Sequence, residues 1–216
     1  MSNALVGKSL ALLSALVVST ATAESGYEES VLRIQRDAAR GREWLLTREG
    51  VLVFDSSKHE SVHVSLPGWL WADESLICPP DLALGPKGEA LVSSNVAPTL
   101  WRIDPLTLSV TRHAPVLDAH ADKDVGFSGL VFSPAQGAFF AVSHFGALWR
   151  IDPQLSRAQH VALSEPVLGA CGVSVRRAKN GFNRFFGLCV RGRQGGWTVN
   201  LAPDRRSGYV VDRNCV

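Results

Sequence analysis

The sequence predicts an all-β fold, a β-propeller of four blades in which each blade is a four-stranded sheet of about 48 residues. Three tryptophans, Trp101, Trp149 and Trp197, stand 48 residues apart. Around the first two the chain repeats the hexapeptide Leu-Trp-Arg-Ile-Asp-Pro, at 100–105 and at 148–153. Repeat periods of about 40 to 50 residues are typical of folds that build one small sheet per repeat. Because such a sheet cannot bury both faces alone, radial stacking hides faces and edges that would otherwise aggregate.

Each repeat contains four short segments rich in β-branched and aromatic residues, which is the composition of strands. Glycine, proline, asparagine and aspartate separate the segments and mark tight turns, and the Asp-Pro pair fits the turn between the third and fourth strands. We expect helix content close to nil and tryptophans that pack between blades. The expected strands are 31–34, 44–47, 51–55 and 62–66; 81–84, 90–93, 100–104 and 108–111; 129–132, 139–142, 148–152 and 160–163; and 172–175, 186–190, 197–200 and 208–211.

The N-terminal residues 1–23 have the pattern of a secretory signal peptide. Lys8 precedes an apolar run at 10–18, and Ala21-Thr22-Ala23 forms a small-x-small cleavage site. No later segment approaches the ~20 apolar residues of a membrane-spanning helix. We therefore expect a periplasmic or secreted protein without a transmembrane segment. Its single domain would cover 24–216, with blades at about 24–70, 71–118, 119–166 and 167–216.

Two repeats share a pattern longer than the hexapeptide. Leu91-Val92-Ser93-Ser94-Asn95 precedes 99–104, and Ala141-Val142-Ser143-His144 precedes 147–152. This pattern resembles the repeat of exported bacterial propellers of the YVTN and NHL type, roughly Tyr-Val-Thr-Asn, a gap and Val-x-Val-Ile-Asp. The resemblance implies architecture rather than activity, because related propellers include binding modules, lactonase-like hydrolases and quinone-dependent dehydrogenases. Members usually have six or more blades, which leaves two alternatives: a four-bladed ring, or two chains that share an eight-bladed one.

Four cysteines follow the signal segment, so an exported chain is expected to form two disulfides. A hairpin centred near Asn180-Gly181 would place Cys171 roughly opposite Cys189, and we expect these two to pair. Cys78 would then pair with Cys215 and tie the end of the chain to the second blade. No Cys-x-x-Cys spacing is present, which argues against a metal site made of cysteines.

The linkers between blades carry the candidate ligand-binding residues. The first linker combines aromatic bulk with acid in Trp69, Trp71 and Asp73. Asp81 follows at the next inner strand, and His144 stands at the turn before Trp149. Linkers of propellers lie on an axial face, where ligands usually bind. The alternatives are that the tryptophans plug the channel or cover a blade, and that His144 bonds a turn carbonyl.

The second linker alternates possible oxygen and imidazole ligands for a cation. Its pattern is similar to a calcium loop, although the expected glycine is displaced to Gly126 and no terminal glutamate follows. A Ca²⁺ site is the functional interpretation, and a solvated acidic turn is the alternative. No other cofactor is expected. The candidate ligands are Asp118, His120, Asp122 and Asp124.

Charge is distributed unevenly along the chain. Residues 170–216 carry a net charge of +7, whereas 24–169 carry −6. The basic fourth blade therefore predicts a protein or anionic ligand as partner, and export argues against nucleic acid. The alternative is that this blade abuts the acidic first blade and helps a ring or a homodimer to close.

The sequence thus favours an exported, non-catalytic propeller that binds a protein, glycan or small ligand through its axial face. No catalytic residue is predicted. The alternative function is a divalent-metal-dependent hydrolase or lactonase with its site in the central channel, using carboxylates such as Asp81, Asp118 or Asp124. Whether the protein is an enzyme stays open at this point.

Overall fold

The computed structural model describes residues 31–73, 78–118, 126–143, 145–163, 167, 170–180, 183–192, 195–200 and 211–212. Within these ranges all regular secondary structure is β-strand, as the sequence predicts. No helix of the described ranges could span a membrane.

The strands form four sheets that follow one another along the chain, and each contains an antiparallel meander of four strands, to which the third sheet adds a fifth strand. The first sheet contains β1 (Val31–Asp37), β2 (Arg42–Thr47), β3 (Val51–Asp55) and β4 (Glu60–Val64). The second contains β5 (Leu82–Leu84), β6 (Ala90–Ser93), β7 (Leu100–Ile103) and β8 (Val110–His113). The third contains β10 (Gly129–Ser133), β11 (Ala138–Val142), β12 (Leu148–Ile151) and β13 (Arg157–Val161). The fourth contains β14 (Ala170–Asn180), β15 (Asn183–Gly192), β16 (Gly195–Asn200) and β17 (Val211–Asp212).

One strand has no counterpart in the expected pattern. β9 (Val116–Leu117) lies between the second and third sheets in sequence and pairs in parallel with β13. Val116 donates its N–H to the carbonyl of Ser156, and Asp118 donates its N–H to Ala158. The chain leaving the second sheet therefore covers part of the outer edge of the third, an edge that would otherwise be free to pair with another strand.

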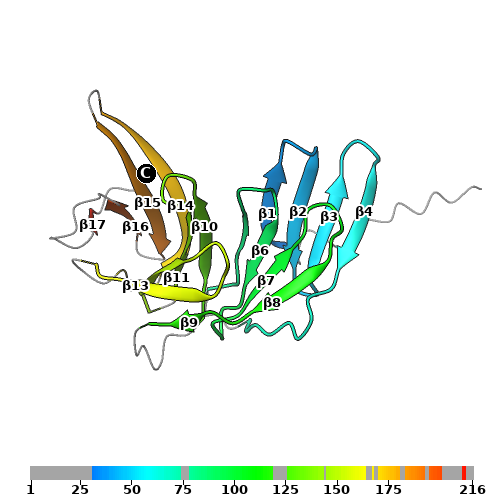
Figure 1. Ribbon diagram of the computed structural model, residues 1–216, viewed down its shortest axis with the longest axis horizontal. Coiled ribbons are helices and arrows are strands. Elements are labelled where there is room, and N and C mark those ends of the chain that lie inside the picture. Colours follow the sequence, from blue (N-terminus) through cyan, green and yellow to red (C-terminus); the bar gives the residue numbers. More distant parts are fainter. Residues whose placement is uncertain are drawn as a thin grey trace, which may run out of the picture.

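The sheets are arranged in an arc, with the first and fourth sheets at its two ends (Figure 1). Their inner strands pack in series, β1 against β5, β5 against β10 and β10 against β14. Where β10 meets β14, a Cβ on Gly129 would lie 2.8 Å from the Cα of Gly172. The absence of a side chain at Gly129 thus lets the inner strand of the third sheet approach that of the fourth closely.

Each interface between neighbouring sheets has its own apolar core. Trp101 packs against the first sheet and Trp149 against the second, and both side chains are 0% exposed. The tryptophan of a sheet therefore contacts the preceding sheet, which confirms the predicted packing role for these two residues. Burial of such a large side chain stabilises the interface by ~3 kcal/mol or more.

An aspartate holds the turn between the third and fourth strands in each of the first three sheets, with a different spacing of its bonds in the third. Asp55, Asp104 and Asp152 each accept backbone N–H groups from residues two to five positions later. The pKa of the Asp104 carboxyl is held below its usual range mainly by the N–H of Thr107, and the pKa of the Asp55 carboxyl mainly by the hydroxyl of Ser57. The aspartate therefore fixes the turn, as expected from Asp-Pro.

The disulfide pairing expected from the sequence is wrong, because Cys171 is bonded to Cys78. The hairpin of β14 and β15 pairs Asn180 with Asn183, so its centre lies between 181 and 182 rather than near 180 and 181. Cys189 is consequently opposite Ser174 and not opposite Cys171. Since Cys78 is taken, it cannot pair with Cys215, which lies outside the described residues. The observed bridge joins the linker before the second sheet to the inner strand of the fourth.

Candidate functional site

The first linker covers the end of the first two sheets. The indole N–H groups of Trp69 and Trp71 both donate to the carbonyl of Arg48, at 3.1 and 3.3 Å. Trp69 also packs edge-on against Trp101, with ring centroids 5.1 Å apart. The two linker tryptophans therefore cover a blade, which was the alternative to a ligand-binding role.

The polar groups beside these tryptophans also contact the linker. Arg48 forms an exposed ion pair of 2.6 Å with Asp73. Asn95 accepts an N–H from Ala72 and donates its amide to the carbonyls of Ala72 and Cys78. The position related to His144 thus holds the linker in the second repeat, whereas His144 itself lies outside the described residues. A ligand-binding role for Trp69, Trp71, Asp73 and His144 stays a prediction.

Asp81 lies where three sheets meet and is 5% exposed. One carboxylate oxygen accepts the N–H of Leu82 at 2.8 Å and lies 3.0 Å from Nε of Arg33 on β1. The other oxygen accepts the N–H of Leu130 on β10 at 2.9 Å. Burial raises the pKa of this carboxyl to about 6, against the opposing attraction of Arg33. These contacts give Asp81 a structural function at the axis, and a ligand role for it stays a prediction.

The second linker is described only at its first residue, Asp118. Its carboxylate accepts the N–H of His160 at 2.7 Å and so extends the contact of β9 with β13. His120, Asp122 and Asp124 lie outside the described residues. Among the residues that the structure describes, no three His, Cys, Asp or Glu side chains are grouped to hold a metal ion. The Ca²⁺ site and the metal-dependent hydrolase therefore stay predictions.

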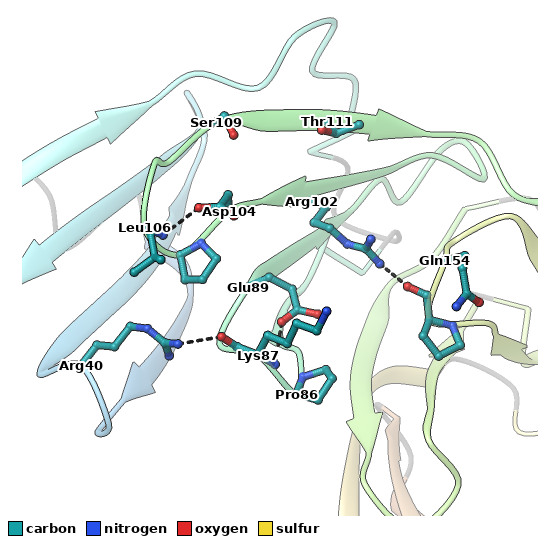
Figure 2. Close-up of a pocket in the computed structure, with 12 residues that line it drawn as sticks. Arg40, Pro86, Lys87, Glu89, Arg102, Asp104, Leu106, Ser109, Thr111 and Gln154 are labelled. Carbon is teal, nitrogen blue, oxygen red and sulfur yellow. Dashed lines mark hydrogen bonds between the residues drawn. The ribbon is translucent and has the colours of Figure 1, made fainter.

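The opposite end of the sheets, where the Asp-Pro turns lie, contains a pocket of about 680 Å³ (Figure 2). This volume is within the range of small-ligand sites, ~300 to 1,000 Å³. Its lining comes from turns and strands of the first three sheets. The lining residues are Arg40, Pro86, Lys87, Glu89, Arg102, Asp104, Pro105, Leu106, Ser109, Thr111, Pro153 and Gln154.

Two arginines of the pocket bridge neighbouring sheets. Arg40 donates to the carbonyl of Lys87 at 2.7 Å and lies directly over Gly88, where a Cβ would clash with its guanidinium. Gly88 has a φ of +82°, a conformation that favours glycine. Arg102 donates to the carbonyl of Pro153 in the third sheet. The pocket is therefore built across sheets whose spacing these contacts hold.

Three basic and two acidic residues line the pocket, and one of the basic residues, Arg40, is also paired with the buried Asp37 at 3.0 Å. Arg40, Lys87 and Arg102 surround it from three elements (Figure 2). Of its two acidic residues, Glu89 is buried and accepts the N–H of Lys87 at 2.8 Å, and Asp104 is engaged in its turn. The side chain of Lys87 is exposed. This arrangement suits a ligand that brings its own acidic group.

The sequence interpretation did not identify this pocket. Arg102 belongs to the repeated hexapeptide, which was assigned to architecture alone. The equivalent Arg150 donates to Gln136 within its own sheet. A comparison of the two arginines would have shown that the repeat has a polar residue at this strand position, but not that Arg102 reaches the next sheet.

Solved structures with similar folds were found, whereas no protein-family model and no curated protein sequence matches the chain. The dihydro-heme d1 dehydrogenase NirN is 15% identical, with a TM-score of 0.56 over 84% of this chain and 36% of NirN. Virginiamycin B lyase from Staphylococcus aureus is 12% identical, with a TM-score of 0.56 over 85% of this chain and 54% of the lyase. The WD40 repeats of RRP9 are 10% identical, with a TM-score of 0.54 over 83% of this chain and 50% of theirs.

These neighbours are β-propeller and WD40-repeat proteins. The chain has a β-propeller fold. At such low identities the likeness establishes the fold alone, and the neighbours include enzymes as well as WD40 repeats. The chain spans 36 to 54% of the length of these three structures. Its described sheets accordingly form an open arc of blades rather than a closed ring (Figure 1).

Proposed function

We propose that this protein is an exported, non-catalytic β-propeller that binds a small acidic ligand in the pocket at the Asp-Pro end of its first three blades. The observation that carries the proposal is the pocket itself, with three basic side chains around it. An acidic oligosaccharide fits this chemistry, since its hydroxyls suit Ser109, Thr111 and Gln154 and its carboxylates suit the basic residues. The Cys78–Cys171 disulfide is compatible with a periplasmic or extracellular location.

The hydrogen bonds of the two acidic residues in the pocket favour a binding role over catalysis. Glu89 and Asp104 both accept backbone N–H groups, and these bonds hold their carboxylates in place. A general base or a metal ligand would need a carboxylate that faces the substrate. The pocket therefore offers donors and positive charge for binding, and its two acids are committed to its walls.

The ligand is tested by titrating a trimer of galacturonate against the protein in a calorimeter. We expect Lys87→Ala to weaken binding about tenfold, because one charge-assisted hydrogen bond contributes ~1.5 kcal/mol or more. Lys58→Ala is the matched control, since Lys58 is an exposed lysine on the turn between β3 and β4, away from the pocket. The neutral trimer of galactose should bind more weakly. Equal binding of both trimers, or equal affinity of Lys87→Ala and wild type, would contradict the proposal.

We also propose that a second copy covers the free face of the first blade, which gives an assembly of eight blades. In the second blade the cross-strand row Leu82, Val92 and Trp101 is buried against the preceding blade. The equivalent row in the first blade is Ile34, Leu45 and Leu52. Ile34 is 56% exposed there, whereas Leu82 is 0% exposed. This chain covers about half of the virginiamycin B lyase and RRP9 structures, which are longer propellers. A second copy of this chain has the size of the other half.

The association is tested by the mass of the protein in solution. We expect a dimer for wild type and a monomer for Leu52→Glu, because a carboxylate at the centre of a buried interface lacks a partner. Val62→Glu is the control: Val62 is 49% exposed on the neighbouring strand and pairs with Val53, which belongs to the core toward the second blade. A wild-type protein that stays monomeric at all concentrations, or a Leu52→Glu variant that stays dimeric, would refute the proposed contact.

A further inference from the structure

The fourth blade differs from the others in the length of its first two strands. β14 has 11 residues and β15 has 10, whereas the strands of the first three blades have at most 7. β16 pairs with β15 only between Gly187 and Gly192. The remainder of the hairpin, 177–180 and 183–186, has no third strand within the described residues. We call these residues the basic arm; it continues β14 and β15 away from the rest of the blade (Figure 1).

The sequence of the basic arm and its surroundings in the fourth blade is rich in positive charge. Arg177, Lys179 and Arg184 lie in it, and the whole stretch 170–203 contains six Lys or Arg and no Asp or Glu. Lys179 and Arg184 are direct cross-strand partners. Like charges in directly opposite positions destabilise a strand pair. A two-stranded ribbon is also only marginally stable by itself in water.

The arm lowers the stability of the fold and extends away from it. A partner of opposite charge that binds the arm would offset this cost. The arm also contains Phe185 and Phe186. Phe186 is the cross-strand partner of Arg177 and shares its face of the ribbon, whereas Phe185 is paired with Ala178 on the other face. Basic residues interspersed with phenylalanine are the composition of segments that lie in the interface of an anionic membrane. A soluble acidic polymer would use the charge but would not require adjacent apolar aromatic residues.

We propose that the basic arm docks the protein on an anionic lipid surface. The arm lies in the fourth blade, whereas the described residues that line the pocket come from the first three blades. The inference is therefore independent of the proposed acidic ligand. It refines the general expectation of an anionic partner for the fourth blade to a defined hairpin and a defined class of partner.

The proposal is tested by cosedimentation of the full chain with vesicles of phosphatidylcholine containing 30% phosphatidylglycerol. Three basic residues near an anionic surface increase the partition coefficient by about a hundredfold in low salt. We therefore expect Arg177→Gln/Lys179→Gln/Arg184→Gln to lose most binding. The matched control, Lys58→Gln/Arg112→Gln/Arg157→Gln, removes three exposed charges from the first three blades and should bind as wild type does. Circular dichroism checks that both variants are folded.

Three results would overturn the proposal: equal binding to vesicles of phosphatidylcholine alone, full binding by the arm variant, or loss of binding in the control. Polygalacturonate binding that the arm variant loses and Lys87→Ala retains, without binding to anionic vesicles, would assign the arm to acidic glycans instead. Lys87→Ala separates the two sites, because it should lower the affinity of the pocket for the trimer of galacturonate and leave vesicle binding unchanged.

Discussion

We expect Cys171→Ser to lower the free energy of unfolding by about 4 kcal/mol, because the Cys78–Cys171 bridge closes a loop with a sequence separation of 93. In the chain-entropy model a loop of this length restricts the unfolded chain by ~4 to 5 kcal/mol. The bridge also joins the linker before the second blade to the inner strand of the fourth, so it limits how far three blades can separate at the axis. Few single substitutions in this chain should cost as much.

Urea unfolding under non-reducing conditions measures this effect. Cys78→Ser and the double variant Cys78→Ser/Cys171→Ser should each be destabilised as much as Cys171→Ser, since all three remove the same bond. A peptide map of the oxidised protein should contain the Cys78–Cys171 cross-linked peptide. A map in which Cys171 is linked to Cys189, or additive losses in the double variant, would show that the bridge is different.

The blade architecture could be predicted because the sequence repeats the pattern of one blade several times. The tryptophan spacing marked the second, third and fourth sheets, and the aligned Asp55 marked the first. Each expected strand overlaps an observed one. β9 was not predicted because Val116 and Leu117 form a segment too short to show the alternation of a strand. Its pairing depends on the outer edge of a blade that comes later in the chain.

The candidate sites were harder to predict because they depend on register and on contacts between blades. An error of one to two residues in the centre of the β14–β15 hairpin moved the partner of Cys189 by three positions, from Cys171 to Ser174, since each residue of turn displacement counts on both strands. Trp69 and Trp71 have the composition of a binding site, but composition does not show that one carbonyl, that of Arg48, accepts both indoles. The pocket combines residues from three repeats, and no single stretch of sequence contains it.

Asp81→Ala should lower the free energy of unfolding by about 3 kcal/mol at pH 7, because it leaves the buried N–H groups of Leu82 and Leu130 without an acceptor. Arg33 loses its partner as well, but its side chain is 41% exposed and can be hydrated. Asp73→Ala is the matched control. It breaks an ion pair in which both side chains are more than half exposed, and such pairs contribute at most ~1 kcal/mol.

The pH dependence of the same comparison tests the electrostatics of Asp81. Its pKa is raised from 3.8 in the unfolded chain to about 6 in the folded protein, mainly by burial. The folded protein therefore binds the extra proton between these two values, and the contribution of Asp81 to stability decreases as the pH rises from about 4 through 6. Two pKa units correspond to ~3 kcal/mol. The difference in unfolding free energy between wild type and Asp81→Ala should thus grow by about that amount as the pH falls from 7 to 4. A free-energy difference that is constant over this range would mean that the Asp81 carboxylate is solvated. The three blades would then be in looser contact at the axis than the distances from Asp81 to Arg33, Leu82 and Leu130 indicate.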